Sequence, residues 1–381
     1  MGPLRASKKR KHSEKKFEVT EERSEEWWDG FSKRINGLVS LSRKDLDGFK
    51  SIFKISRSTF DYICSLVRDK AGNFSFTNGN PLSLNDQVAV ALRRLSSGES
   101  LMTIADAFGL SHSTVSQVTW NFVEAMEERA LHHLQWPSSE PEMSQIKTKF
   151  EKICGLPNCC GAIDTTHVVI NMPLGDRSSK AWLDRETNHS MILQAIVDPD
   201  MRFRDVVTGW PGQVDDSMAL RSSSFFELCE KGKRLAGKKM ELAGGSELRE
   251  YIVGDSGFPL LSWLVTPYQG KDAREATSRV EFNRRHYKTR KVARKALARL
   301  KERWRIIRGV MWRPDKHRLP RVILVCCLLH NIVIDLEGHQ LEEEGVTLSH
   351  RHDPGYRKQV CESVDMAGLL QRERLSRYFI A

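Results

Sequence analysis

The chain has 381 residues, of which 40% are hydrophobic, so it is long enough for one large domain with a buried core and a smaller one. Its formal net charge of +11 and its pI near 9.3 favour an anionic partner, nucleic acid before a membrane surface. The eight cysteines include no CxxC pair, which indicates a reduced compartment and excludes a disulfide framework or a zinc module. The longest apolar run, Val322 to Ile334, is too short to span a bilayer, and no signal peptide opens the chain. We therefore expect a soluble intracellular protein.

Residues 1–26 are charged and almost free of large apolar side chains, which predicts a disordered tail. The tail contains a compact basic run, Lys8, Lys9, Arg10 and Lys11. Such a run is typical of a nuclear localisation signal, so we expect the protein in the nucleus. A solvated tail that only aids solubility is the alternative.

A helical region is expected over residues 27–135. Helical patterns at 85–95 and 101–108 are followed by Gly109 and by a third helix that Ser111 caps. Helix, short glycine-containing turn and capped helix form the helix-turn-helix pattern, in which the start of the last helix meets DNA bases. The candidate DNA-binding residues there are His112, Ser113, Thr114 and Gln117. An ordinary three-helix bundle with solvated polar residues is the alternative.

A second domain is expected after a linker from Trp136 to Met143, which is rich in Ser and Pro. Apolar segments at 159–170, 190–197 and 203–208 read as strands joined by short turns, which predicts an antiparallel meander. A fourth strand follows at 251–255. Because strands alternate with helices, the pattern predicts an α/β domain with a sheet at its centre.

Two of these apolar strands each carry one acid, Asp164 and Asp255. A carboxylate in apolar surroundings needs a cation or several hydrogen-bond donors. If the strands are neighbours, the two carboxylates lie about 4.8 Å apart and can hold divalent cations for phosphoryl chemistry. Paired aspartates at strand ends also serve as helix caps and turn formers, which is the structural alternative.

Five blocks of sequence resemble, in the same order, those of Harbinger-type DDE transposases and their domesticated nuclease relatives. They are C-C-G-A-I-D-T-T-H, G-W-P-G-Q-V-D-D-S, V-G-D-S-G-F-P-L-L, F-N-R-R-H and L-V-C-C-L-L-H-N-I. The resemblance covers roughly residues 50–335. Within that group the chain is similar to the plant antagonist of like-heterochromatin-protein family, whose stretch W-R-I-I…V-M-W-R-P-D it shares at Trp304 to Asp315.

The resemblance implies an α/β fold: an RNase H-like DDE nuclease domain over residues 144–336, with a mixed sheet flanked by helices. The all-α helix-turn-helix region precedes it, and a polar tail, 337–381, follows. The resemblance also implies nuclear location and an ancestral DNA nuclease activity that depends on Mg²⁺ or Mn²⁺. Close relatives are expected to act on chromatin with the Polycomb repressive complex. Transposase relatives often need a separate DNA-binding protein, so a Myb-like partner is a further expectation; no membrane partner is expected.

The family's two catalytic and metal-binding aspartates carry over onto Asp164 and Asp255. Its third acid, the glutamate of a pattern like R-x-x-V-E-R-A-F-G-x-L-K, does not, because Arg294 stands at that position. We therefore predict that Arg294 neutralises both aspartates by charge-assisted hydrogen bonds, where the metal once lay.

The alternative is that Arg294 turns to solvent and leaves a weakened metal site with a different third ligand. Candidates for that ligand are Glu281, Glu302 and Asp216, none of which has the family's position. Glu302 follows Arg294 by about two helical turns, which is about 12 Å along a helix.

The segment from Arg284 to Arg308 holds twelve Lys or Arg and one acid, Glu302. Such a concentration of positive charge is suited to phosphate contacts. The candidate DNA-binding residues are Arg284, Arg285, Lys288, Arg290 and Lys291. The leading hypothesis is a non-catalytic, transposase-derived nuclear protein that binds DNA or chromatin and influences Polycomb silencing. The second is a residual metal-dependent endonuclease; without such activity no cofactor is expected.

Overall fold

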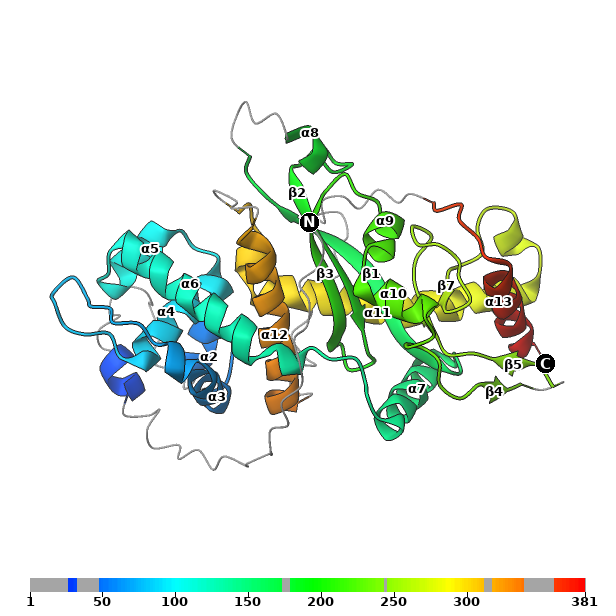
Figure 1. Ribbon diagram of the computed structural model, residues 1–381, viewed down its shortest axis with the longest axis horizontal. Coiled ribbons are helices and arrows are strands. Elements are labelled where there is room, and N and C mark those ends of the chain that lie inside the picture. The colour runs from blue at the N-terminus through cyan, green and yellow to red at the C-terminus, as the bar shows by residue number, and fades with distance from the viewer. Residues whose placement is uncertain are drawn as a thin grey trace. The chain divides into compact units, whose positions relative to one another are not determined.

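A computed structural model describes residues 27–32, 48–172, 179–242, 245–311, 317–338 and 360–380 (Figure 1). The predicted localisation signal at Lys8 to Lys11 lies outside these ranges. The chain divides into two compact units. The first comprises residues 1–133, 303–308 and 328–343, and the second comprises the rest. The helical unit therefore takes in two later segments of the chain that the sequence did not assign to it.

The first unit is helical, as predicted. Its elements are a helical segment at 27–32, α2 (Gly48–Phe53), α3 (Arg57–Val67), α4 (Leu84–Ser97), α5 (Leu101–Phe108) and α6 (His112–Arg129). Serine caps start four of these helices, and each cap accepts a hydrogen bond from a backbone N–H in the first turn. Gly98 and Gly109 end α4 and α5 with φ of 68° and 64°, a left-handed conformation that glycine adopts without strain.

Aromatic side chains fill the core of this unit. Phe53 and Phe60 are fully buried, and the ring of Trp27 stacks on Phe60 with centroids 5.1 Å apart. Helices α4 and α5 both pack on α6, so the three helices follow one another with the short turns that the sequence predicted. Contact of α6 with DNA bases stays a proposal.

The expected linker from Trp136 to Met143 is shorter than predicted. Trp136 is buried, and its ring packs on Phe225 with centroids 4.9 Å apart. Ser139 caps α7 (Glu140–Cys154), whose first turn tolerates Pro141 because the N–H groups there have no helical partner. The pattern of Ser and Pro therefore marks the start of a helix.

The second unit is built on a mixed five-stranded sheet with the order β3-β2-β1-β6-β7. The strands are β1 (Cys159–Val169), β2 (Ser190–Val197), β3 (Phe203–Pro211), β6 (Tyr251–Val253) and β7 (Leu264–Val265). β1, β2 and β3 are antiparallel neighbours, which confirms the predicted meander, whereas β6 and β7 run parallel to β1. The short strands β4 (Met240–Glu241) and β5 (Glu247–Leu248) pair separately.

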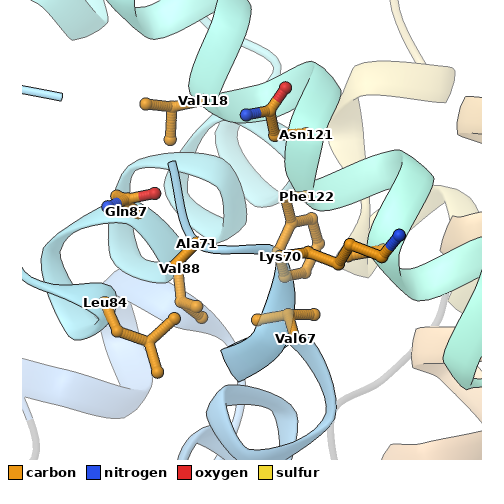
Figure 2. Close-up of a pocket in the computed structure, with 10 residues that line it drawn as sticks. Val67, Lys70, Ala71, Leu84, Gln87, Val88, Val118, Asn121 and Phe122 are labelled. Carbon is orange, nitrogen blue, oxygen red and sulfur yellow. The ribbon is translucent and has the colours of Figure 1, made fainter. Parts of the chain in front are cut away.

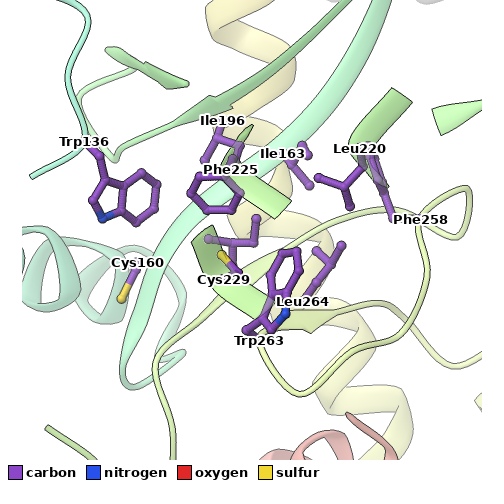
Figure 3. Close-up of a cluster of buried hydrophobic side chains, with 11 residues drawn as sticks. Trp136, Cys160, Ile163, Ile196, Leu220, Phe225, Cys229, Phe258, Trp263 and Leu264 are labelled. Atoms are coloured by element: carbon purple, nitrogen blue, oxygen red, sulfur yellow. The ribbon is translucent and has the colours of Figure 1, made fainter. Parts of the chain in front are cut away.

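Helices lie against this sheet (Figure 1). They are α7, α9 (Asp216–Arg221), α10 (Ser224–Glu230), α11 (Thr277–Arg303) and α13 (Met366–Tyr378). The short helix α8 (Ser179–Trp182) belongs to the connection between β1 and β2 and projects away from the sheet (Figure 1). The core packs Ile163 of β1 and Leu264 of β7 with Leu220 of α9 and Phe225 of α10 (Figure 3). Since successive strand residues point to opposite faces, Asp164 leaves this core and turns to the other face of β1.

The described part of the predicted polar tail, 360–380, contains a helix and packs within the second unit. The N–H of Cys361 donates to the carbonyl of Ser256 at 2.7 Å, so the segment runs along the loop that follows Asp255. Helix α13 then buries Leu375 fully, and the side chain of Gln371 pairs with the backbone of Arg249. The C-terminal segment is thus part of the second unit.

Helix α12 (Leu319–Glu337) is longer than the apolar run in the sequence suggested. By length and composition alone, α12 could cross a membrane, and it is the one helix among the described residues of which this is true. Most of its side chains are buried, as in the core helix of a soluble protein.

Candidate functional site

The site lies where β1 and β6 run side by side. Ala162 of β1 is opposite Val253 of β6, so Asp164 and Asp255, each two residues further on, come out at the same edge. Both are 8% exposed. Each carboxylate accepts a backbone N–H nearby: Asp164 from Thr165 at 3.0 Å and Asp255 from Gly257 at 2.9 Å. The expectation that the two acids lie on neighbouring strands is confirmed.

Two arginines of α11 lie against these carboxylates. Arg294 Nε donates to Asp164 Oδ2 at 3.3 Å. Arg290 Nη1 is 3.0 Å from Asp255 Oδ2 and 3.8 Å from Asp164 Oδ2, an ion-pair distance without the alignment of a hydrogen bond. Residues 290 and 294 are one helical turn apart and so face the same way.

This geometry both bears out and amends the sequence prediction. Arg294 does contact Asp164 and is 9% exposed, so the alternative in which it faces solvent is wrong. Asp255, however, forms its ion pair with Arg290, which is 4% exposed. Arg290 was expected among the DNA-contacting residues, and its buried position in the carboxylate cluster corrects that. The helical spacing of 290 and 294 was the signal that could have identified it.

Burial sets the electrostatics of the pair. Burial raises the pKa of Asp164 above its usual range; Arg290 opposes the rise, Asp255 adds to it and Arg294 opposes it. The Nε2–H of His286, one turn before Arg290, donates a hydrogen bond to the carbonyl of Val265 at 3.1 Å. Burial and the charge of Arg290 together lower the pKa of His286 to about 3, so this ring is neutral near pH 7.

A third carboxylate, Asp216 at the start of α9, belongs to the same cluster. The pKa of Asp216 is raised to about 7, because burial and the charge of Asp255 raise it more than a hydrogen bond from the Thr165 side chain lowers it. Gln194 on β2 is almost fully buried, and its Nε2 donates to the carbonyl of Asp216 at 3.0 Å. The side-chain Oε1 of Gln194 has no hydrogen-bond partner among the described residues.

The other two candidates for a third acid lie elsewhere. Glu281 accepts hydrogen bonds from Arg284 and Arg285 on the outer part of α11. Glu302 is exposed near the end of the same helix. Of the three acids that the sequence named, only Asp216 is electrostatically coupled to Asp164 and Asp255.

The cluster does not fit a divalent metal ion in this conformation. Mg²⁺ and Mn²⁺ bind through carboxylate oxygens and require them to be free of competing cations. Here guanidinium nitrogens lie at the Oδ2 atoms of both Asp164 and Asp255. Within the part of the chain that the structure describes, no three His, Cys, Asp or Glu side chains are grouped so that they could hold a metal ion.

The predicted DNA-binding residues of α6 lie at its start. His112, Ser113 and Gln117 are exposed, and Thr114 is partly buried. The hydroxyls of Ser113 and Thr114 each lie 2.8 Å from the Ser111 hydroxyl, so they also support the helix cap.

On α11 the basic residues divide between two faces. Arg284, Lys288 and Lys295 are exposed and Lys291 is partly so, with its ammonium 5.6 Å from the centroid of the Tyr287 ring. These four, which we call the basic stripe, are spaced by three or four residues and share one face of the helix. Arg285 is instead bonded to Glu281 and to the carbonyl of Cys154.

The first unit contains a surface hollow. The hollow lies between α3, α4 and α6, and its volume of about 260 Å³ includes space that is open to solvent. Its lining is mainly apolar and includes Val67, Val88 and Phe122 (Figure 2). Lys70 at its rim pairs with Glu128 at 2.9 Å. It lacks the convergent polar groups of a catalytic site.

Comparison with known proteins identifies the family. The family model of the DDE superfamily endonuclease matches residues 163–331. The chain is 59% identical over 355 residues to the ALP1-like protein of Arabidopsis thaliana, covering 92% of this chain and 85% of that relative. The chain belongs to this ALP1-like family of transposase-derived proteins. Family membership is consistent with the mixed sheet flanked by helices.

Two further relatives define the breadth of the family. Antagonist of like heterochromatin protein 1, also from Arabidopsis thaliana, is 47% identical over 360 residues, covering 93% of this chain and 89% of its own. A rat protein named provisionally as the nuclease HARBI1 is 29% identical over 352 residues, covering 90% and 95%. No solved structure matches the chain.

Proposed function

We propose that this chain is a domesticated transposase-derived protein that has lost nuclease activity and acts in the nucleus on chromatin. Its DDE-type unit supplies a fold of the RNase H-like kind, which the order of antiparallel and parallel strands supports. The name of the relative that antagonises a heterochromatin protein supports a role in gene silencing. The protein would oppose Polycomb-group silencing by associating with subunits of the Polycomb repressive complex.

The observation that carries the loss of catalysis is the bond from Arg294 to Asp164. Two-metal hydrolysis needs carboxylates that hold cations, because the cations activate the water and stabilise the leaving oxygen. An arginine at the third position supplies positive charge but no open coordination site for water. The carboxylates of Asp164 and Asp255 then pair with arginine instead of holding a metal ion that would activate water.

A metal-dependent nicking assay on supercoiled DNA tests this proposal. We expect no cleavage by the wild-type protein in Mg²⁺ or Mn²⁺, because Arg294 stays bonded to Asp164. Gain of Mn²⁺-dependent nicking in Arg294→Glu, and its loss in Arg294→Glu/Asp164→Asn, would support the domesticated site. Cleavage by the wild type that Asp164→Ala abolishes would overturn it.

Cleavage by the wild-type protein would support the alternative function, a metal-dependent DNA endonuclease. The description of the matched family as an endonuclease favours it, as does the presence of Asp216 beside the two family aspartates. Asp216 would then be the replacement third acid, and Arg294 would have to swing away for a metal to bind. Loss of wild-type cleavage in Asp216→Asn would identify this arrangement.

DNA contact is proposed for the basic stripe of α11 and for the start of α6. The stripe spans about 17 Å from Arg284 to Lys295, which is about five nucleotide steps along one strand. His112, Ser113, Thr114 and Gln117 would meet bases, unless a Myb-like partner supplies that contact. Nuclear import would depend on Lys8 to Lys11, and a tagged protein with all four changed to alanine should stay outside the nucleus.

A further inference from the structure

Two adjacent histidines in the first unit converge on one tyrosine. They belong to the 3-10 turn η2 (Leu131–His133), which follows α6. The Nε2 of His133 lies 2.8 Å from the hydroxyl oxygen of Tyr62 on α3, and the Nε2 of His132 lies 3.5 Å from the same oxygen. The two imidazole rings are close, with centroids 4.2 Å apart. Both Nε2 atoms therefore point toward the hydroxyl oxygen of Tyr62.

The far side of each ring is held by a second interaction. His133 Nδ1 lies 3.0 Å from Asp335 Oδ2 of α12, and the Asn331 side chain donates to the carbonyl of His133 at 2.8 Å. The His132 ring makes a hydrogen bond to the backbone of Arg129. A carboxylate or carbonyl that accepts from Nδ1–H leaves Nε2 with its lone pair directed outward. This is how most metal-binding histidines are oriented.

The two histidine rings can be reached from solvent. His132 is exposed and His133 partly so, which leaves the point between them accessible from solvent.

We propose that His132 Nε2, His133 Nε2 and the Tyr62 hydroxyl oxygen bind one divalent transition-metal ion of the Zn²⁺ class. Imidazole nitrogen suits Zn²⁺, Co²⁺ and Ni²⁺, whereas Mg²⁺ prefers oxygen ligands. The fourth position of a tetrahedral site is taken by water. The Tyr62 O–H bond breaks as the metal–oxygen bond forms, and its proton leaves to solvent without any change of oxidation state.

The inference does not depend on the carboxylate cluster or on DNA cleavage. The three proposed ligands lie in the first unit. The proposed metal site differs from a cluster of His, Cys, Asp and Glu side chains because its third ligand is a phenol. A bound ion would join α3 to the turn after α6, and through Asp335 to α12. Burial raises the pKa of Tyr62, so the phenol keeps its proton until a metal displaces it.

Calorimetric titration of the full chain with Zn²⁺ tests this site. Cys154 and Cys361 are partly exposed, so the measurement uses a Cys154→Ser/Cys361→Ser background to remove binding by thiols. We expect one equivalent of Zn²⁺ with release of a proton, seen as a dependence of the measured heat on the ionisation enthalpy of the buffer. Mg²⁺ should give no heat of binding.

Variants separate the ligands from the fold. His132→Ala should weaken Zn²⁺ binding at least tenfold without lowering stability, because His132 is exposed; His112→Ala on α6 is the matched control and should bind as the parent does. Asp335→Asn should weaken it by about tenfold to a hundredfold, the range for residues that orient a ligating histidine. Tyr62→Phe should weaken binding and abolish the proton release. Unchanged affinity in His132→Ala/His133→Ala, or unchanged proton release in Tyr62→Phe, would overturn the proposal.

Discussion

Arg294 Nε lies 3.3 Å from Asp164 Oδ2 in a cluster where both side chains are almost excluded from water. The contact joins helix α11 to the central strand β1. A guanidinium at this distance makes a charge-assisted hydrogen bond to the carboxylate. Arg294 therefore adds a positive charge beside the buried carboxylate of Asp164.

Replacing Arg294 by methionine should lower the free energy of unfolding by about 2–4 kcal/mol, because the buried carboxylate of Asp164 keeps only the longer ion pair with Arg290. Urea unfolding near pH 7 measures the change. Arg284→Met, which removes an exposed ion pair with Glu281, is the control and should cost less than about 1 kcal/mol. Equal effects of the two variants would mean that the buried contact does not stabilise the fold.

The pKa of Asp216 makes stability depend on pH in a defined direction. Its folded-state pKa of about 7 exceeds the model-compound value of 3.8, so the folded state holds the proton more tightly than the unfolded state. This contribution is fully present below the unfolded value and is lost as pH rises through about 7. Asp216→Asn should therefore lose less stability than the parent between pH 5 and pH 8. A steeper loss in the variant would contradict this assignment.

The basic stripe should account for salt-dependent binding to duplex DNA. Arg284→Glu/Lys288→Glu/Lys295→Glu should weaken binding and flatten the plot of log affinity against log salt by about 3, since each phosphate contact contributes about 0.9 to the slope. A control with the same charge change, Lys231→Glu/Lys233→Glu/Lys238→Glu, lies outside the stripe and should alter both quantities less. Fluorescence anisotropy over a series of salt concentrations gives the comparison.

Helix α13 offers a matched pair of leucines. Leu375 is fully buried, so Leu375→Ala should cost about 2–5 kcal/mol through lost apolar contacts and a residual cavity. Leu370 is 53% exposed, and its replacement by alanine should change stability by less than about 0.5 kcal/mol. Thermal unfolding distinguishes them. If both variants lost less than about 0.5 kcal/mol, the packing of α13 through Leu375 would not contribute to stability.

Much of this architecture could be predicted from the sequence because local patterns specify it. The Ser caps and Gly stops located α4, α5 and α6, and the apolar runs located β1, β2 and β3. The family pattern singled out Arg294. Periodicity could not reveal pairings between distant segments, such as Cys361 with Ser256, or the assignment of residues 328–343 to the helical unit.

The candidate site was predicted in its acids but not in its complete charge balance. Arg290 was counted with the surface cations because α11 is basic all along its length, and only the packing of the helix on the sheet decides which cations are inside. Asp216 was named only as one of three candidate third ligands, because nothing in the sequence shows that α9 begins beside β1. Both depend on tertiary contacts rather than on local spacing.

The positive charge of Arg294 is covalently attached to the chain, so its local concentration does not vary with the supply of ions in the cell. A metal ion at the same carboxylates would dissociate when magnesium or manganese became scarce, and the repulsion between Asp164 and Asp255 would then return. With arginine the cluster stays neutralised under all such conditions. The charge that faces Asp164 is therefore insensitive to chelators and to metal starvation.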